Sequence, residues 1–148
     1  MNKKIVALLL LLTTLFLSLF MQSCNENDPA LGSATVVVAG KEIKEFEVSL
    51  DGLDTDRGLV ALLDKLKENG EIDYGITDTY LDFVGEVKND YEKSEFIFVY
   101  TSVEKDFDVS EMKSTIEYEG KELTSSGVGA LDMTIEDGAV YYITTIKW

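Results

Sequence analysis

Hydrophobic residues follow three different patterns along this chain, and the first is one nearly unbroken block. Two lysines precede the run Ile5 to Met21, in which three hydroxyl residues are the only interruptions. A charged start followed by an apolar stretch is the layout of a secretory signal peptide. An uncleaved membrane-spanning helix is the alternative, because the run just reaches the length that a bilayer requires.

A period of two follows the block. Thr35 to Val38 is a β-branched run, and in Ile43 to Leu50 apolar side chains alternate with polar ones. Alternation of this kind is typical of a half-buried strand. Gly40-Lys41 between the two segments is a plausible turn, so the pattern predicts a β-hairpin.

The period then changes to that of an amphipathic helix of about three to four turns. Four leucines share one face, and charged residues occupy the other. We expect Thr55 or Asp56 to cap the start of this helix and Asn69-Gly70 to end it. The leucine face is expected to pack against the sheet. The leucines are Leu59, Leu62, Leu63 and Leu66.

The second half of the chain indicates further strands separated by turns. Glu95 to Val103 is apolar on both faces, which is typical of a central strand. Ser125 to Ala130 contains two glycines and is expected to be a flexible loop. The turn signal Asp137-Gly138 predicts a final hairpin. The other predicted segments are a strand with a glycine break at Tyr80 to Val87, a hairpin of Thr115 to Tyr118 with Lys121 to Leu123, and the final hairpin of Leu131 to Ile135 with Ala139 to Ile146.

These elements predict an α+β fold. Two strands, one helix and then several strands are the layout of a β-grasp-like mixed sheet with the amphipathic helix packed on one face. The 125 residues that follow position 23 are enough for one core and too few for two comfortable domains. We therefore expect one domain over residues 34–148.

The single cysteine lies directly behind the apolar block. Met21-Gln22-Ser23-Cys24 resembles the lipobox of bacterial lipoproteins, in which the cysteine thiol takes diacylglycerol before cleavage. This resemblance implies a signal peptide over residues 1–23, a lipid on Cys24 and a polar tether over residues 24–33. A secreted protein with Cys24 as a free thiol is the alternative. The lipoprotein interpretation places the domain in the bacterial cell envelope, attached to the membrane and facing outside the cytoplasm.

The net charge and the scarcity of arginine and histidine limit which partners and reactions are compatible with the sequence. The net charge is −15, and it becomes −17 when residues 1–23, which hold two lysines and no acid, are removed. Such a field repels nucleic acid and anionic lipid head groups. Arg57 is the only arginine and the sequence has no histidine, which argues against bidentate phosphate recognition, imidazole catalysis and histidine metal ligation. We expect no cofactor, no metal and no nucleic-acid partner.

The acid-rich stretch Asp51 to Gly58 is the densest candidate for a calcium loop. Asp54 and Asp56 alternate as calcium ligands do, but no suitably placed closing glutamate follows them. A turn that feeds a helix, with carboxylates near the helix N-terminus, accounts for the same residues. We favour the turn.

Several segments of the chain resemble one known family. The family is the uncharacterised domain family related to the C-terminal domain of transcobalamin and intrinsic factor, and the match covers about Thr35 to Lys147. The resemblance implies a β-grasp-like fold, frequent attachment to bacterial cell-surface proteins and lipoproteins, and cobalamin or another bulky molecule as a ligand. The segments are Thr55 to Leu63, Tyr80 to Val87, Phe96 to Ser102, Tyr118 to Lys121, Gly127 to Gly129 and Ile135 to Tyr141.

Three classes of function are compatible with the sequence. The first is a non-catalytic binding or interaction module on the cell surface, whose partner is a surface protein or a small ligand. The second is a lipoprotein that captures a corrinoid or another solute for an uptake system. The third, disfavoured class is a carboxylate-based extracytoplasmic enzyme, because nothing in the spacing of the acids selects two of them.

The candidate ligand-binding residues lie on the uncharged loop and at the start of a strand. An uncharged segment in a strongly acidic chain can make contact without burying carboxylates, and glycines let a backbone approach a partner closely. A turn that merely needs left-handed backbone is the alternative. Tyr74, Tyr80, Tyr91 and Tyr100 are further candidates, as a stacking platform for a sugar or another ring, with ordinary packing as the alternative. The predicted site residues are Tyr80, Phe83, Gly127, Val128 and Gly129.

Overall fold

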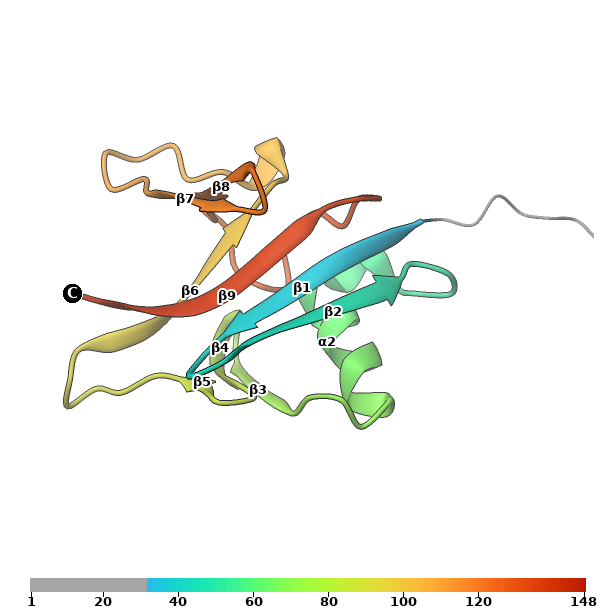
Figure 1. Ribbon diagram of the computed structural model, residues 1–148, viewed down its shortest axis with the longest axis horizontal. Coiled ribbons are helices and arrows are strands. Elements are labelled where there is room, and N and C mark those ends of the chain that lie inside the picture. The colour runs from blue at the N-terminus through green and yellow to red at the C-terminus, as the bar shows by residue number, and fades with distance from the viewer. Residues whose placement is uncertain (1–31) are drawn as a thin grey trace, which may run out of the picture. The chain divides into compact units, whose positions relative to one another are not determined.

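The computed structural model describes residues 32–148 (Figure 1), and the predicted signal peptide, Cys24 and most of the tether lie outside this range. The described residues form an α+β structure that is mostly sheet, with one α-helix. None of the helices in the described range is long and apolar enough to cross a bilayer.

The first predicted hairpin is confirmed. Strand β1 (Ser33–Ala39) pairs antiparallel with β2 (Ile43–Ser49), and Val36 lies opposite Phe46. The alternating pattern places Phe46 and Val48 on one face, where Val48 is buried, while Ile43 lies on the other face with the exposed Glu45 and Glu47.

The predicted helix is confirmed, but its expected cap is wrong. Helix α2 (Leu59–Glu68) buries its four leucines and ends at Asn69, followed by Gly70 with φ +73°. Thr55 and Asp56 lie in a separate 3-10 turn, η1 (Thr55–Arg57), and no side chain caps α2. The residue before the helix is Gly58, whose φ of +57° turns the chain between η1 and α2.

The C-terminal strand is where the sequence-based topology is wrong. Strand β9 (Val140–Lys147) lies parallel to β1 and does not pair with residues 131–135. Those residues are not a strand; Leu131, Met133 and Ile135 pack into the core from an irregular segment. The turn before β9 does form, and the Gly138 amide donates to the Ser33 carbonyl at 2.7 Å.

The predicted central strand is confirmed. Strand β6 (Glu95–Thr101) pairs antiparallel with β9 on one side and with β8 (Lys121–Ser125) on the other. The predicted hairpin is also confirmed, because β8 pairs antiparallel with β7 (Thr115–Tyr118). A short 3-10 turn, η2 (Glu104–Asp106), follows β6. The six-stranded sheet therefore has the order β2-β1-β9-β6-β8-β7.

A second, three-stranded sheet contains the segment with the glycine break. Strand β4 (Tyr80–Val84) pairs with β3 (Tyr74–Thr77) and, across the turn at Gly85, with β5 (Val87–Lys88). The sequence analysis expected one interrupted strand here and missed β3.

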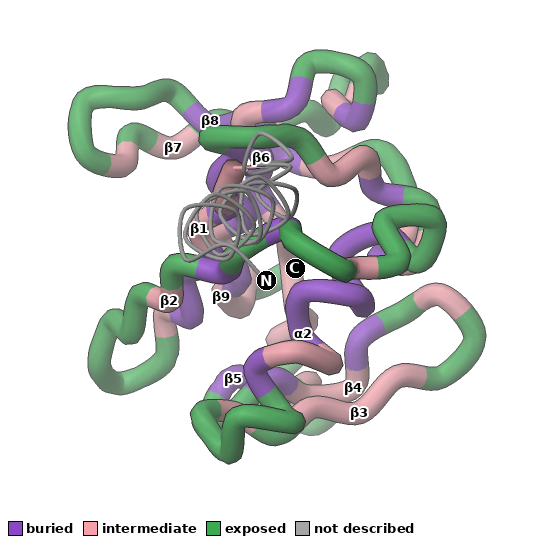
Figure 2. The backbone as a smooth tube through the Cα atoms, turned by 90° about the vertical axis from the view of Figure 1, so that its right-hand side faces the viewer, coloured by how far each residue is buried: buried purple, intermediate pink, exposed green. Residues whose placement is uncertain are grey.

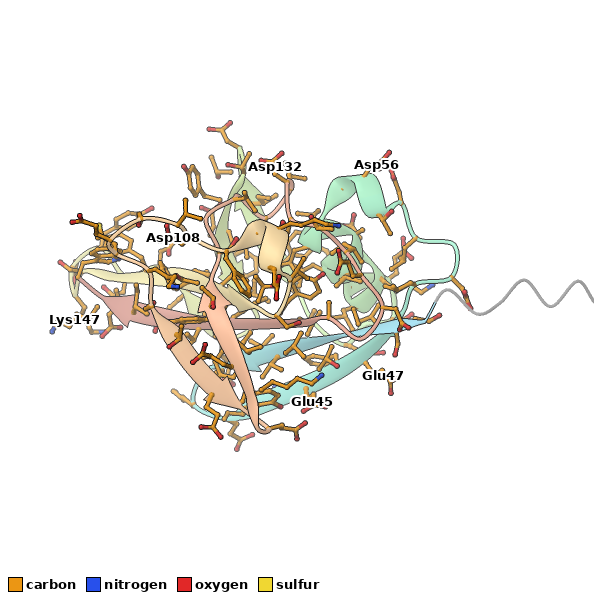
Figure 3. All side chains as sticks on the ribbon, turned by 90° about the horizontal axis from the view of Figure 1, so that it is seen from above. Glu45, Glu47, Asp56, Asp108, Asp132 and Lys147 are labelled. Atoms are coloured by element: carbon orange, nitrogen blue, oxygen red, sulfur yellow. The ribbon has the colours of Figure 1, made fainter. Side chains whose placement is uncertain are left out.

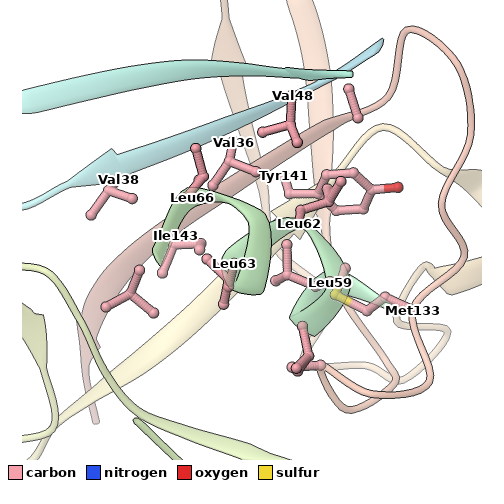
Figure 4. Close-up of a cluster of buried hydrophobic side chains, with 14 of the residues drawn as sticks. Val36, Val38, Val48, Leu59, Leu62, Leu63, Leu66, Met133, Tyr141 and Ile143 are labelled. Atoms are coloured by element: carbon pink, nitrogen blue, oxygen red, sulfur yellow. The ribbon is translucent and has the colours of Figure 1, made fainter. Parts of the chain in front are cut away.

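The two faces of the six-stranded sheet are packed differently. The inner face and the small sheet enclose α2, so the helix leucines contact Val36, Val38 and Tyr141 (Figure 4). The outer face has a smaller cluster built on Val37, Tyr100, Leu123 and Val140. Figure 2 shows α2 buried among its neighbours, whereas the loops around it are exposed.

Candidate binding surface

Ala130 fixes the predicted loop to two other elements. Its amide donates to the Thr79 carbonyl at 3.0 Å, and its carbonyl accepts from the Leu59 amide, at the start of α2, at 2.9 Å. The loop is therefore held between the N-terminus of the helix and the turn that precedes β4.

The other loop residues are tied to β6 and η2. The Ser126 amide donates to the Val99 carbonyl, and the Gly127 amide donates to the Asp106 carbonyl, both at 2.8 Å. The hydroxyl of Ser126 also bonds to the backbone of Val128. These bonds give a supported loop where the glycines had led us to expect a flexible one.

Close packing inside the protein explains both glycines. A Cβ on Gly129 would lie 2.7 Å from the Cβ of Thr79, and one on Gly127 would lie 3.0 Å from the Cα of Asp108. Neither glycine has the positive φ that would need left-handed backbone. At these two positions the glycines therefore allow Thr79 and Asp108 of the same protein to approach closely. The sequence analysis had attributed this close approach to a binding partner.

The Thr79–Ala130 junction brings four of the five predicted site residues to one end of the molecule. Tyr80 adjoins Thr79 and is 74% exposed, and Val128, two residues before Ala130, is 40% exposed. Phe83 lies elsewhere on β4, where its ring covers Gly75 of β3. The predicted surface therefore consists of Tyr80 with Gly127, Val128 and Gly129, while Phe83 packs on the small sheet.

Asp106 supports this end of the molecule and was not anticipated. Its carboxylate is buried and accepts hydrogen bonds from the Thr134 amide at 2.7 Å and from the Thr134 hydroxyl at 2.9 Å. Tyr141 donates its hydroxyl to the Thr134 carbonyl, and burial raises the pKa of Tyr141. In an acid-rich sequence, no local signal distinguishes this buried carboxylate from the solvated ones.

The four tyrosines proposed as a stacking platform do not gather. Tyr100 is buried in the outer-face cluster, and Tyr74 donates its hydroxyl to Asp64 of the helix at 2.5 Å. Burial and the nearby Asp64 carboxylate raise the pKa of Tyr74 to about 12. Only Tyr80 and Tyr91 are exposed, on different elements.

The shifted pKa values of the charged side chains come from contacts at the surface, mostly ion pairs. Lys67 lowers the pKa of Asp73, and Lys93 lowers that of Asp90, in each case through a 2.6 Å ion pair. Such solvated pairs are typical of a protein surface. Within residues 32–148, no three acidic or cysteine side chains lie close enough to hold a metal.

Two small hollows lie on the surface, and only the second borders the helix. One, of about 160 Å³, is lined by Val38, Ile72 and several acids, and the other, of about 200 Å³, is lined by Leu53, Arg57 and Asp64. Pockets for drug-sized ligands are usually about 300–1,000 Å³. The exposed side chains of Tyr80 and Val128 are therefore better placed than these hollows to contact a large partner.

Comparison with known proteins identifies the fold alone. No protein-family profile matches the chain, and no curated protein matches it. Among solved structures, the chain is similar to a crystal structure from Ruminococcus gnavus described as a "putative metal binding protein". The two share 15% identity with a TM-score of 0.50, over 79% of this chain and 98% of the other.

Proposed function

We propose that this chain is a lipid-anchored, extracytoplasmic binding module without catalytic function. The observation that carries the proposal is the Thr79–Ala130 junction, which holds the exposed side chains of Tyr80 and Val128 on a rigid base. Binding residues commonly lie on loops that a rigid scaffold positions. The partner is a surface protein or a small ligand.

The finer description of the fold is part of the same proposal. A β-grasp-like domain related to the C-terminal domain of transcobalamin is supported by the strand order β2-β1-β9-β6, in which β1 and β9 are parallel. The helix that follows β2 and packs on one face of this sheet also supports it.

Intact mass spectrometry of the protein extracted from bacterial membranes tests the anchor. We expect residues 1–23 to be absent and Cys24 to carry diacylglycerol. A Cys24→Ser variant should keep its signal peptide and lose the lipid mass. An unmodified Cys24, or an intact segment from Met1 to Ser23 in the wild-type protein, would contradict the proposal.

The corrinoid-capturing alternative rests on the family resemblance and has its own test. Trp148 is the only tryptophan in the sequence, so a bound corrinoid would quench its fluorescence by energy transfer. Cyanocobalamin is titrated into the lipidated chain up to about 1 mM, where binding is worth only about 4 kcal/mol. Saturable quenching that Tyr80→Ala weakens would support corrinoid binding at the proposed surface, and no saturable quenching would dismiss it.

A further inference from the structure

The outer face of the six-stranded sheet is only half covered. The hairpin of β7 and β8 folds over one half, where the Tyr118 ring lies 5.3 Å from that of Tyr142. The Tyr118 hydroxyl donates to Glu45 of β2, the strand at the opposite edge of the sheet. Glu45 is labelled in Figure 3. The contact between Tyr118 and Glu45 closes the covered half.

The other half remains open, and its side chains follow from the strand register. Ile43 lies opposite Ala39, Thr144 donates its hydroxyl to the Ala39 carbonyl, and Phe98 lies opposite Thr144. Two residues further along these strands, in the next row of paired residues on the same face, Phe96 of β6 lies opposite Ile146 of β9. Paired residues share a face, so these side chains form one floor across four strands. We call this floor the open half, made of Ala39, Ile43, Phe96, Phe98, Thr144 and Ile146.

Two exposed aromatic residues extend the open half. The Tyr91 ring meets that of Phe96 edge-on, at 5.6 Å and 78°. Trp148 follows β9 in the same alternation as Ile146, and its amide donates to the Ser94 carbonyl at 3.0 Å. Tyr91 is 75% exposed, Trp148 60% and Ile43 62%. Contiguous exposed apolar residues of this kind commonly mark interaction sites.

The net charge of the domain limits which kind of molecule can bind to the open half. The floor of the open half carries no charged side chain, although residues 32–148 hold 26 acids and 11 bases. A net charge of this sign repels anionic ligands and also a second copy of the chain. The neighbouring Glu45 bonds to Tyr118, and Asp90 pairs with Lys93 beside Tyr91. A neutral ligand meets neither the repulsion nor the cost of burying an unpaired charge.

We propose that the open half binds a neutral carbohydrate by stacking sugar rings on Tyr91, Phe96 and Trp148. The face of an aromatic ring is electron-rich, so it attracts the weakly positive C–H groups on the apolar face of a sugar. The Asp90 carboxylate, next to Tyr91 in the chain, and the Thr144 hydroxyl, in the row next to Phe96, can accept hydrogen bonds from sugar hydroxyls. This site is separate from the Tyr80 surface and does not depend on it.

Fluorescence of Trp148 tests the site, because the reporter lies within it. The full chain, in the non-glycosidic detergent lauryldimethylamine oxide, is titrated with cellohexaose, laminarihexaose, xylohexaose, mannohexaose and chitohexaose up to about 5 mM. We expect at least one to give a saturable emission change with a Kd of about 1 mM or tighter.

Matched variants assign the signal to the open half. Tyr91→Ala should weaken that binding about tenfold, because it removes one stacking ring. Tyr80→Ala and Val109→Ala, both at exposed positions outside the open half, should leave it unchanged. Tyr80→Ala also separates this site from the surface proposed above, since loss of function there would not alter sugar binding.

Three results would overturn the proposal. One is the absence of saturation with all five hexasaccharides. Another is sugar binding that Tyr91→Ala leaves intact. The third is a dimer in analytical ultracentrifugation that Tyr91→Ala dissociates, because a second copy would then occupy the open half.

Discussion

The two faces of the six-stranded sheet are built from the same strands but differ in how they are covered. Along β9, Tyr141 and Ile143 point inward and are completely buried, whereas Tyr142 and Thr144 point outward and are only partly buried. The inner face is closed by α2 and the small sheet, and the outer face is closed over half its length by one hairpin. We infer that the inner face provides most of the stability, which leaves the open half of the outer face available for binding.

The largest expected effect comes from the inner face. Leu62→Ala or Leu63→Ala should lower the free energy of unfolding by about 2–5 kcal/mol, because both side chains are completely buried. The matched truncation Ile43→Ala, at an exposed position of the outer face, should change it by less than about 0.5 kcal/mol. Urea denaturation measures all three. Equal losses at Leu62 and Ile43 would remove the distinction between the faces.

Gly58 tests how closely the helix approaches the loop that follows β8. A Cβ at this position would lie 2.6 Å from the Ala130 carbonyl oxygen, and φ is +57°. Gly58→Ala should therefore cost about 2–4 kcal/mol, from left-handed strain and overpacking together. Gly52→Ala is the control, since Gly52 has φ +72° with open space around it, and should cost about 1 kcal/mol. Similar thermal midpoints for the two variants would show that the loop containing Ala130 moves to accommodate the added methyl group.

Tyr118 tests how firmly the hairpin closes the covered half of the outer face. Tyr118→Phe removes the hydrogen bond to Glu45 and keeps the ring against Tyr142. We expect a loss of about 1 kcal/mol in the free energy of unfolding. Hydrogen exchange of the β7 and β8 amides should accelerate as well. If exchange stays unchanged, the hairpin is held by other contacts.

Alkaline pH provides a smaller and reversible version of the same change. The Glu45 carboxylate raises the pKa of Tyr118 from 10.0 to about 12, so the folded protein holds this proton more tightly than the unfolded chain. The stabilisation is fully present below pH 10.0 and is lost as the pH rises to about 12. Unfolding measured across this window should show a shallower decline in Tyr118→Phe than in the wild-type protein. A parallel decline in both proteins would mean that Tyr118 contributes nothing to it.

Local signals explain which parts of the fold could be predicted from sequence. The first hairpin and α2 depend on periodicity and turns within a few residues, and both are confirmed. Strand β9 could not be placed in this way, because it pairs with β1, about 100 residues earlier in the chain. The alternating Leu131, Met133 and Ile135 resembled a strand because an irregular segment buries them in the core.

The candidate binding surfaces, like the fold, could be predicted from local sequence signals only in part. The sequence analysis placed Tyr80 and Gly129 in one candidate site, and the Thr79–Ala130 hydrogen bond brings their segments together. The open half depends on cross-strand register, which places Ile43 and Phe98 on one face. The charged residues around Tyr91 and the apolar strand around Tyr100 already indicate which of the two is exposed, although both were considered for stacking.

The most direct test of the account is an amide NMR shift map of the full chain during titration with the tightest-binding neutral hexasaccharide. The account predicts that perturbations concentrate around Ile43, Phe96 and Ile146 and at Tyr91 and Trp148, with the amides of α2 unchanged. Perturbations centred on α2 or the small sheet would contradict the claim that the inner face stabilises the protein while the open half of the outer face binds the sugar. The absence of perturbations with any of the five sugars would contradict it as well.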